Sequence, residues 1–223
     1  VANGVEAFER KRHISLPARF RKLEAVRLEK LLDLWLALEI RRRQAFDVIA
    51  CEQREAVEIE GIRVSMVVDR IDQLADGRQV IIDYKTGAVI DTKNWAAQRI
   101  TEPQLPIYAA LVNDEVAAVV FAKVLLDKPG FAGVADEKDI LPGVQGIGDD
   151  KQKIFDPAEF PDWVAVITHW RERLHAIARE VKEGQAGVVF ADEKALQYCE
   201  VLPLLRLPEH RRLLATALAG RPA

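Results

Sequence analysis

Cysteines are few in this sequence, and long apolar runs are missing from it. The 223 residues include two cysteines, Cys51 and Cys199, which stand at unrelated positions and imply no disulfide framework. No apolar run approaches the roughly 18 residues of a membrane span, and no secretory signal is recognisable. We therefore expect a cytoplasmic protein that does not engage a membrane.

Several motifs that would assign an activity are also missing. The sequence has no internal repeat, no glycine-rich phosphate loop and no Walker-type motif. Any helicase or ATPase activity must therefore belong to another part of the polypeptide or to a partner. No serine or cysteine stands in a nucleophile setting, and packing accounts best for the thiol of Cys199.

The composition is that of a globular domain able to bury a substantial core, with 49% hydrophobic and 30% charged residues. The net charge of −3 argues against indiscriminate binding of nucleic acid. Residues 1–50 hold 11 Lys and Arg against 7 Asp and Glu, a net charge of +4. The remaining residues therefore carry a net charge of −7. A carboxylate-rich metal site would contribute to that negative balance.

Residues 61–108 hold most of the chemically suggestive side chains. Two β-branched runs, 62–74 and 79–84, flank the dipeptide Asp76-Gly77, a strong signal for a β-hairpin. The hairpin carries one aspartate on its first strand, and an aspartate and a lysine on its second. Its loop length decides how these three side chains are arranged.

A two-residue turn would pair Asp69 with Tyr84, whereas a three-residue loop with Gly77 in the left-handed conformation pairs Asp69 with Asp83. We favour the three-residue loop. Directly opposed residues have Cβ atoms about 4.5–5.5 Å apart, so the two carboxylates would share one cation. Alternation then places Lys85 on the face of Asp83 and turns Tyr84 to the other face.

Two carboxylates and a lysine on one face have a chemical use. Hard oxygen ligands suit Mg²⁺ or Mn²⁺, whose coordination shells are completed by waters and by substrate phosphate oxygens. The lysine steers or deprotonates an attacking water, or offsets charge that develops on the phosphorus centre. The pattern predicts a site for metal-assisted phosphodiester hydrolysis.

Three ordered motifs, VVDRID, IIDYKTG and EPQLPIYA, resemble motifs II and III and the following Gln-Tyr helix of the PD-(D/E)XK nucleases. The resemblance is to the RecB/AddB-like branch, found in helicase-nucleases and DNA repair proteins, and is strongest over residues 46–125. It implies an α/β fold of the restriction-endonuclease-like type, with a mixed central sheet flanked by helices. It also implies a DNA substrate, Mg or Mn as cofactor, and a helicase domain or subunit as a candidate partner.

The resemblance assigns a role to each matching residue. Asp69 and Asp83 would be metal ligands, joined by the main-chain carbonyl of Tyr84, and Lys85 would be the catalytic lysine. These four positions form the expected reaction centre.

On the substrate side, Gln104 and Tyr108 match the family's Gln-Tyr pair. They are four residues apart, so on a helix opened by Pro103 they share a face. Arg99, in a loop or short helix over residues 88–102, either contacts a substrate phosphate or is a surface arginine.

The chain departs from this family at two places. Members of the branch carry a further metal-binding His upstream of the hairpin, in a context like Gly-Thr-x-x-His that is not found here. His13 stands in RKRHISLP, which resembles a linker, and the chain begins with Val1; we expect a C-terminal piece of a longer protein.

The second departure is near the C-terminus. Residues 196–206 resemble the family's Cys-x2-Cys-x5-Cys-Arg iron–sulfur segment, with leucine at two cysteine positions and only Cys199 retained. A cluster needs four thiolates or close substitutes, so we expect no iron–sulfur cluster. Apolar packing of the leucines would hold the segment instead.

Apolar periodicity predicts two long helices outside the hairpin. Residues 17–44 carry a Leu and Trp stripe at helical spacing. The second helix is predicted to begin at a cap formed by Asp156 before Pro157 and to end at Gly184. The polar face of the first helix either touches DNA backbone or is a solvated helix face; its basic residues are Arg27, Lys30, Arg41, Arg42 and Arg43.

We expect one nuclease-like domain over 1–223. Its parts are an N-terminal helical part (1–45), a catalytic core (46–126), a mobile excursion (127–155), and a helix with a C-terminal tail (156–223).

Three charged residues near the core are open to more than one interpretation. Glu52 is either a further ligand-shell carboxylate or an exposed strand residue. Asp72 falls by parity on the face opposite Asp69, which favours a salt bridge with Arg70 or a neighbour. Lys123 interrupts the apolar strand predicted over 116–126, and either extends its ammonium to the strand end or meets a carboxylate.

The function that these features predict is metal-dependent cleavage of DNA by the nuclease domain of a repair or recombination protein. The alternative is a nuclease-like module without catalytic activity that binds DNA or scaffolds a helicase-nuclease complex. This alternative would account for the missing upstream histidine and the altered cysteine segment.

Overall fold

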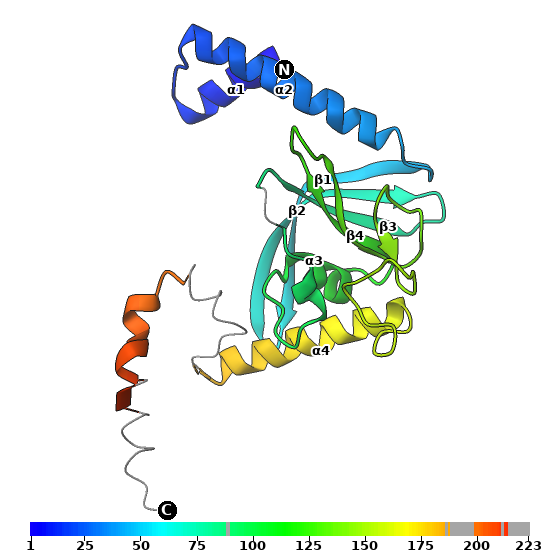
Figure 1. The fold of residues 1–223 in the computed structure, drawn as a ribbon, viewed down its shortest axis with the longest axis vertical. Coiled ribbons are helices and arrows are strands. Elements are labelled where there is room, and N and C mark those ends of the chain that lie inside the picture. Colours follow the sequence, from blue (N-terminus) through cyan, green and yellow to red (C-terminus); the bar gives the residue numbers. More distant parts are fainter. Residues whose placement is uncertain (88–89, 186, 188–198, 211, 214–223) are drawn as a thin grey trace, which may run out of the picture. The chain divides into compact units, whose positions relative to one another are not determined.

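The computed structural model describes residues 1–87, 90–185, 187, 199–210 and 212–213. Val1–Arg179 form one compact unit and Glu180–Ala223 form a second. The first unit has an α/β fold in which helices flank a mixed sheet, as the sequence predicts (Figure 1). Among the described residues, no helix combines the length and the apolar character needed to cross a membrane.

The sheet has six strands in the order β1-β2-β3-β4-β5-β6. The β3–β4 and β5–β6 pairs are parallel and the other neighbours are antiparallel. The strands are β1 (Phe46–Ile59), β2 (Ile62–Leu74), β3 (Gln79–Lys85), β4 (Val116–Lys123), β5 (Gly130–Ala135) and β6 (Gln145–Gly146). The helices are α1 (Ala2–Arg12), α2 (Ala18–Glu39), η1 (Lys93–Ala96), α3 (Gln104–Ile107), η2 (Tyr108–Val112), α4 (Trp163–Lys182) and η4 (Leu202–Leu205).

The loop between β2 and β3 has the predicted three-residue form. Gly77 has a φ of 92°, in the left-handed region that glycine tolerates, and the N–H of Leu74 donates to the carbonyl of Arg78 over 2.8 Å. The ladder ends with Arg70 opposite Ile82. One further step of this register sets the two predicted metal-ligand carboxylates opposite each other.

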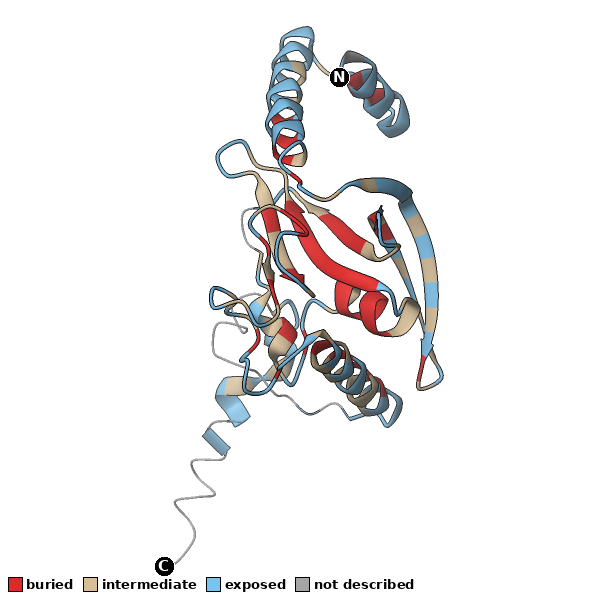
Figure 2. Cartoon of the chain, turned by 90° about the vertical axis from the view of Figure 1, so that its right-hand side faces the viewer, coloured by how far each residue is buried: buried red, intermediate tan, exposed pale blue. Residues whose placement is uncertain are grey.

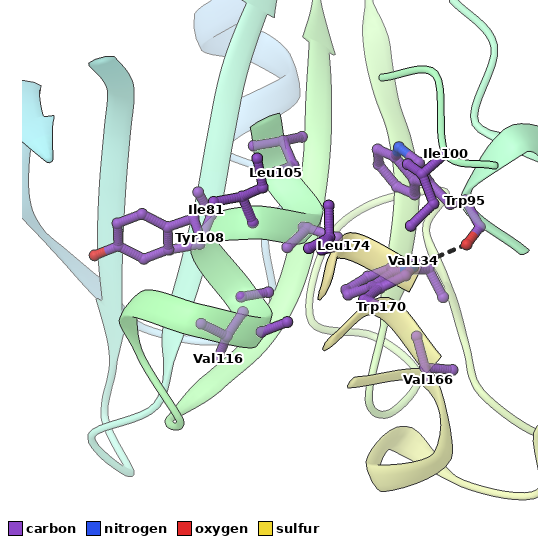
Figure 3. Packing of buried hydrophobic residues seen from close by; sticks show 14 of the residues in the cluster. Ile81, Trp95, Ile100, Leu105, Tyr108, Val116, Val134, Val166, Trp170 and Leu174 are labelled. Atoms are coloured by element: carbon purple, nitrogen blue, oxygen red, sulfur yellow. Dashed lines mark hydrogen bonds between the residues drawn. The ribbon is translucent and has the colours of Figure 1, made fainter. Parts of the chain in front are cut away.

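One face of the sheet is covered by α4, α3 and η2. Their apolar side chains form a cluster with strand residues such as Ile81 and Val134 (Figure 3). Trp170 of α4 donates its indole N–H to the carbonyl of Trp95 over 2.9 Å, which satisfies a polar group inside this cluster. The loop that carries η1 is thereby fixed against α4.

The other face is covered by the C-terminal half of α2 and by the segment between β5 and β6. Trp35 and Leu38 of α2 and Ile140 and Leu141 of that segment are buried against it. Figure 2 shows burial concentrated on the central strands, while much of α1 and α2 is exposed. Residues 127–155 thus contribute two strands and part of the core; their predicted mobility stays a prediction.

Both long helices are shorter than predicted. α2 ends at Glu39 instead of residue 44, because the chain turns there and carries the side chain of Arg42 into the interior. α4 begins at Trp163, since Asp156 caps only a single turn. The N-cap of α4 is Asp162, which accepts a 2.8 Å hydrogen bond from the N–H of Ala165. Gly184, with a φ of 67°, follows the helix end as predicted.

The inward turn of Arg42 corrects the prediction that it lies on a polar helix face. Its side chain is 1% exposed and forms an ion pair with Asp72. The guanidinium also stacks over the ring of Phe46, 3.4 Å from the ring centroid. Arg42 therefore stabilises the junction between α2 and the sheet and is not available to a DNA backbone.

The β1–β2 hairpin is linked to α4 by an ionic contact at its turn. Glu60 lies in the two-residue turn with a φ of 52°. Its carboxylate accepts one hydrogen bond from the guanidinium of Arg179 and one from Nδ1 of His175, each 2.8 Å long. The hydrogen bond to His175 is the main cause that lowers the pKa of Glu60 below its ordinary value.

The lowered pKa of Glu60 predicts a pH-dependent contribution to stability. A depressed carboxyl pKa stabilises the fold above the unfolded pKa of glutamate, and this contribution is lost as the pH falls through the folded pKa. We expect Glu60→Gln to lower the urea midpoint slightly at pH 7, with a difference that shrinks toward pH 3. A difference that is constant from pH 7 to pH 3 would contradict this assignment.

Candidate active site

The β2–β3 hairpin brings together the residues of the predicted metal site. Asp69 lies one residue beyond the last ladder pair, and its Oδ2 accepts a 2.8 Å hydrogen bond from the backbone N–H of Tyr84. A side chain thus takes the place of the next ladder acceptor. The strands diverge here while the Asp69 carboxylate stays fixed, with Oδ1 left for another ligand.

Asp83 and Lys85 share one face of β3. Their neighbours on that face, Ile81 and Phe121, belong to the cluster under α4, whereas Tyr84 packs against Trp35 on the other face. Lys85 Nζ lies 2.9 Å from Asp83 Oδ2. The alternation that the sequence predicts for β3 is therefore confirmed.

Asp83 is a buried carboxylate, only 5% exposed. Burial raises its pKa above the ordinary value; the Lys85 ammonium opposes this shift and the nearby Asp69 carboxylate adds to it. Oδ2 receives no hydrogen bond of normal geometry among the described residues, although Lys85 forms an ion pair with it. Such a charge gains from a bound cation, which compensates for the lost hydration.

The surroundings of Lys85 keep it protonated. Partial burial lowers its pKa, but the contact with Asp83 and the carboxylates of Glu102 and Asp69 outweigh burial, and the net pKa is raised. An ammonium near neutral pH cannot accept a proton from water. In this arrangement Lys85 suits the orientation of water and the compensation of negative charge better than proton abstraction.

The donor set fits a small divalent cation. Asp69 and Asp83 supply carboxylate oxygens from adjacent strands. The N–H of Tyr84 points toward β2, so the carbonyl of the same residue also points to that side, where the ladder has ended. Within the described residues no group of three or more Asp, Glu, His or Cys could hold a metal ion. Two carboxylates, a carbonyl, waters and substrate oxygens are the ligands that Mg²⁺ commonly takes.

Gln104 and Tyr108 lie one helical turn apart; Gln104 is half-buried and Tyr108 is buried. Gln104 donates from Nε2 to the carbonyl of Val67 over 2.6 Å, two residues before Asp69. Tyr108 is 4% exposed, and burial raises its pKa. Their contact with substrate stays a prediction; in this structure Gln104 is bound to the strand that carries Asp69.

The remaining candidates differ in their exposure. Arg99 is exposed in the loop before α3. Glu52 is exposed and has a φ of 52°; in the register of β1 and β2 it falls opposite Asp69. Asp72 is buried and forms ion pairs with Arg70, as predicted, and with Arg42.

Two contacts near the site were not predicted from the sequence. The guanidinium of Arg70 donates to the hydroxyl of Tyr84 over 3.1 Å, which fixes the residue whose backbone holds Asp69. Lys123 of β4 stands in register beside Lys85. The only signal for the second contact was a charged residue within an apolar strand.

The cysteine segment falls only partly within the described residues, because residue 196 lies outside them. Cys199 is a free, half-buried thiol, and Leu205 ends η4. The expected absence of an iron–sulfur cluster stays a prediction.

Among the comparisons with known proteins, a family model agrees with this geometry. A solved structure titled "Crystal structure of SSO0001" is 14% identical and covers 82% of this chain and 71% of its own, at a TM-score of 0.34, too low to support an argument. No curated protein matches the chain. The family model described as "PD-(D/E)XK nuclease superfamily" matches residues 2–204. With its hairpin carboxylates and lysine in the order of that family's motifs, the chain belongs to the PD-(D/E)XK nuclease superfamily.

Proposed function

We propose that this chain hydrolyses DNA phosphodiester bonds with Mg²⁺ or Mn²⁺, as a RecB/AddB-like nuclease domain of a repair or recombination protein. The observation that carries the proposal is the arrangement of two aspartates where the β2–β3 ladder ends. Asp69 accepts a hydrogen bond from the N–H of Tyr84, and the register places it opposite the buried Asp83. Lys85 lies beside Asp83 on the same face. Membership of the nuclease superfamily supports the same reaction class.

In this mechanism Asp69, Asp83 and the Tyr84 carbonyl hold the cation. When bound, the cation would polarise the scissile phosphate and lower the pKa of a bound water. The Lys85 ammonium orients the attacking water and offsets negative charge on the phosphate. Lys85 Nζ lies 2.9 Å from Asp83 Oδ2, next to the carboxylates that would hold the cation.

The substrate would approach from the side of α3 and the preceding loop. Arg99 would bind a backbone phosphate, while Gln104 and Tyr108 would position the strand near the scissile phosphate. A helicase domain or subunit would supply unwound DNA, because the sequence has no ATP-binding motif of its own. A cytoplasmic location is part of this proposal.

A second candidate function is a DNA-binding or scaffolding module without catalytic activity. It is favoured by the absence of the Gly-Thr-x-x-His context and by leucines at two cysteine positions of the C-terminal segment. The two functions differ in one measurable property, which is turnover.

The deciding experiment measures cleavage of labelled single-stranded and duplex DNA in Mg²⁺ and in Mn²⁺. We expect cleavage with either metal and complete loss with EDTA, because the carboxylates cannot activate water without the cation. Activity that survives EDTA would overturn the metal-dependent mechanism. A folded protein that binds DNA but does not cut it would establish the second candidate function.

A further inference from the structure

β4 ends on a lysine that the mechanism above does not use. Val116–Lys123 is buried along its length except at Lys123. Alternate residues of β4, including Val119 and Phe121, belong to the cluster under α4. Lys123 continues this alternation and therefore lies on the face that carries Asp83 and Lys85.

The position of Lys123 relative to Lys85 is fixed by the sheet. The two residues are direct partners in the parallel β3–β4 ladder. The N–H of Val124 donates to the carbonyl of Lys85 over 2.9 Å, so the pairing continues past them. Neighbouring strands are about 4.8 Å apart, which places two lysine side chains next to each other at the end of the sheet.

The two lysines differ in their partners. Lys85 is paired with Asp83, whereas Lys123 forms no ion pair with any carboxylate of the described residues. On the next strand Lys123 faces Gly130, where an added Cβ would lie 3.9 Å from Lys123 Cε. The side chain thus extends over a position that has no side chain of its own. Lys123 is half-buried, and its ammonium, which has no carboxylate partner among the described residues, suits a bound phosphate.

We propose that Lys123 forms a second phosphate subsite, which binds a backbone phosphate of the DNA strand next to the scissile phosphate at Lys85. This inference rests on the proposed function. Its consequence is that the bound strand crosses the ends of β3 and β4, from Lys85 toward Gly130. A lysine in this role acts as a point charge and reads no base sequence.

The test measures binding of fluorescent single-stranded and duplex DNA by anisotropy in EDTA, over a series of salt concentrations. Loss of one phosphate contact makes the slope of log K against log salt shallower by about 0.7 for a single strand and about 0.9 for a duplex. We expect this change for Lys123→Ala and recovery in Lys123→Arg. Lys11→Ala, which removes an exposed lysine of α1, should leave the slope unchanged.

Cleavage assays on the same variants separate binding from chemistry. Lys123→Ala should raise KM several-fold with little change in kcat, because the contact is present before and during the reaction. A Lys123→Ala slope equal to that of Lys11→Ala, with the parent protein binding DNA, would overturn the subsite. If the parent protein neither binds nor cuts DNA, the proposed function itself fails.

Discussion

Asp83→Asn should reduce the rate of DNA cleavage by about 10³-fold and leave the fold intact. The carboxylate supplies a metal ligand, and metal activation contributes several kcal/mol to the transition state, which corresponds to rate factors of this size. Asparagine has nearly the same shape, so the packing next to Phe121 is kept. The measurement is kcat on labelled DNA in saturating Mg²⁺ and in saturating Mn²⁺.

Stability gives an independent readout for the same variant. Burial raises the pKa of Asp83, which means that the folded protein favours the neutral side chain. Above the folded pKa the ionised form therefore reduces stability relative to an ordinary carboxylate. We expect the thermal midpoint of Asp83→Asn at pH 7 to equal or exceed that of the parent protein.

A matched control is available at the opposite end of β4. Asp114→Asn changes the same functional group at a position whose side chain is 92% exposed, and it should cut DNA at the parent rate. Asp83→Asn activity within about tenfold of the parent rate would contradict the assignment of Asp83 as a metal ligand. A lowered midpoint with lost activity would show that the carboxylate is needed for folding.

The hairpin could be predicted because its information is local. Gly77 allows the left-handed conformation that a three-residue loop needs, and that loop fixes which aspartates oppose each other. The period-two alternation then decides which side chains share a face, and the structure follows it at Asp83, Tyr84 and Lys85. Each step depends on residues close together in the chain.

The structural features that could not be predicted depend on contacts between segments that are distant in the sequence. Arg42 stands in a run of three arginines, and nothing local distinguishes the one that reaches Asp72, thirty residues away. The start of α4 could not be predicted because Asp156 and Asp162 both accept capping hydrogen bonds, from the N–H groups of Ala158 and Ala165, and the local sequence does not decide between them.

The candidate site shows the same limit. Spacing places Gln104 and Tyr108 on one helical face, but it does not say whether that face meets solvent or the hairpin. Tertiary packing against β1 and β2 buries Tyr108 and ties Gln104 to the carbonyl of Val67. Register between β3 and β4 likewise depends on a crossover of about thirty residues, so a charged residue within an apolar strand marks Lys123 but does not identify Lys85 as its neighbour.

The buried ionic cluster behind the site predicts the largest effect on stability. Asp72 is fully buried and binds the guanidinium groups of Arg42 and Arg70, and Arg70 also bonds to Glu39 and to the hydroxyl of Tyr84. Without Asp72 the two guanidinium groups would share the single carboxylate of Glu39, and part of their charge would be uncompensated in a medium of low polarity. The cluster joins the end of α2 to β2 and β3, directly behind the proposed metal ligands.

We expect Asp72→Ala to lower the free energy of unfolding by about 3–5 kcal/mol, because Arg42 is 1% exposed and cannot reach water without local unfolding. Urea denaturation at pH 7 gives this value from the midpoint and the slope. Glu6→Ala removes a carboxylate that is paired with Arg10 at 3.9 Å on the surface, and it should change stability by less than about 0.5 kcal/mol. A loss below about 1 kcal/mol for Asp72→Ala would mean that the arginines find other partners. In that case the position of Tyr84, and with it that of Asp69, would not depend on Asp72.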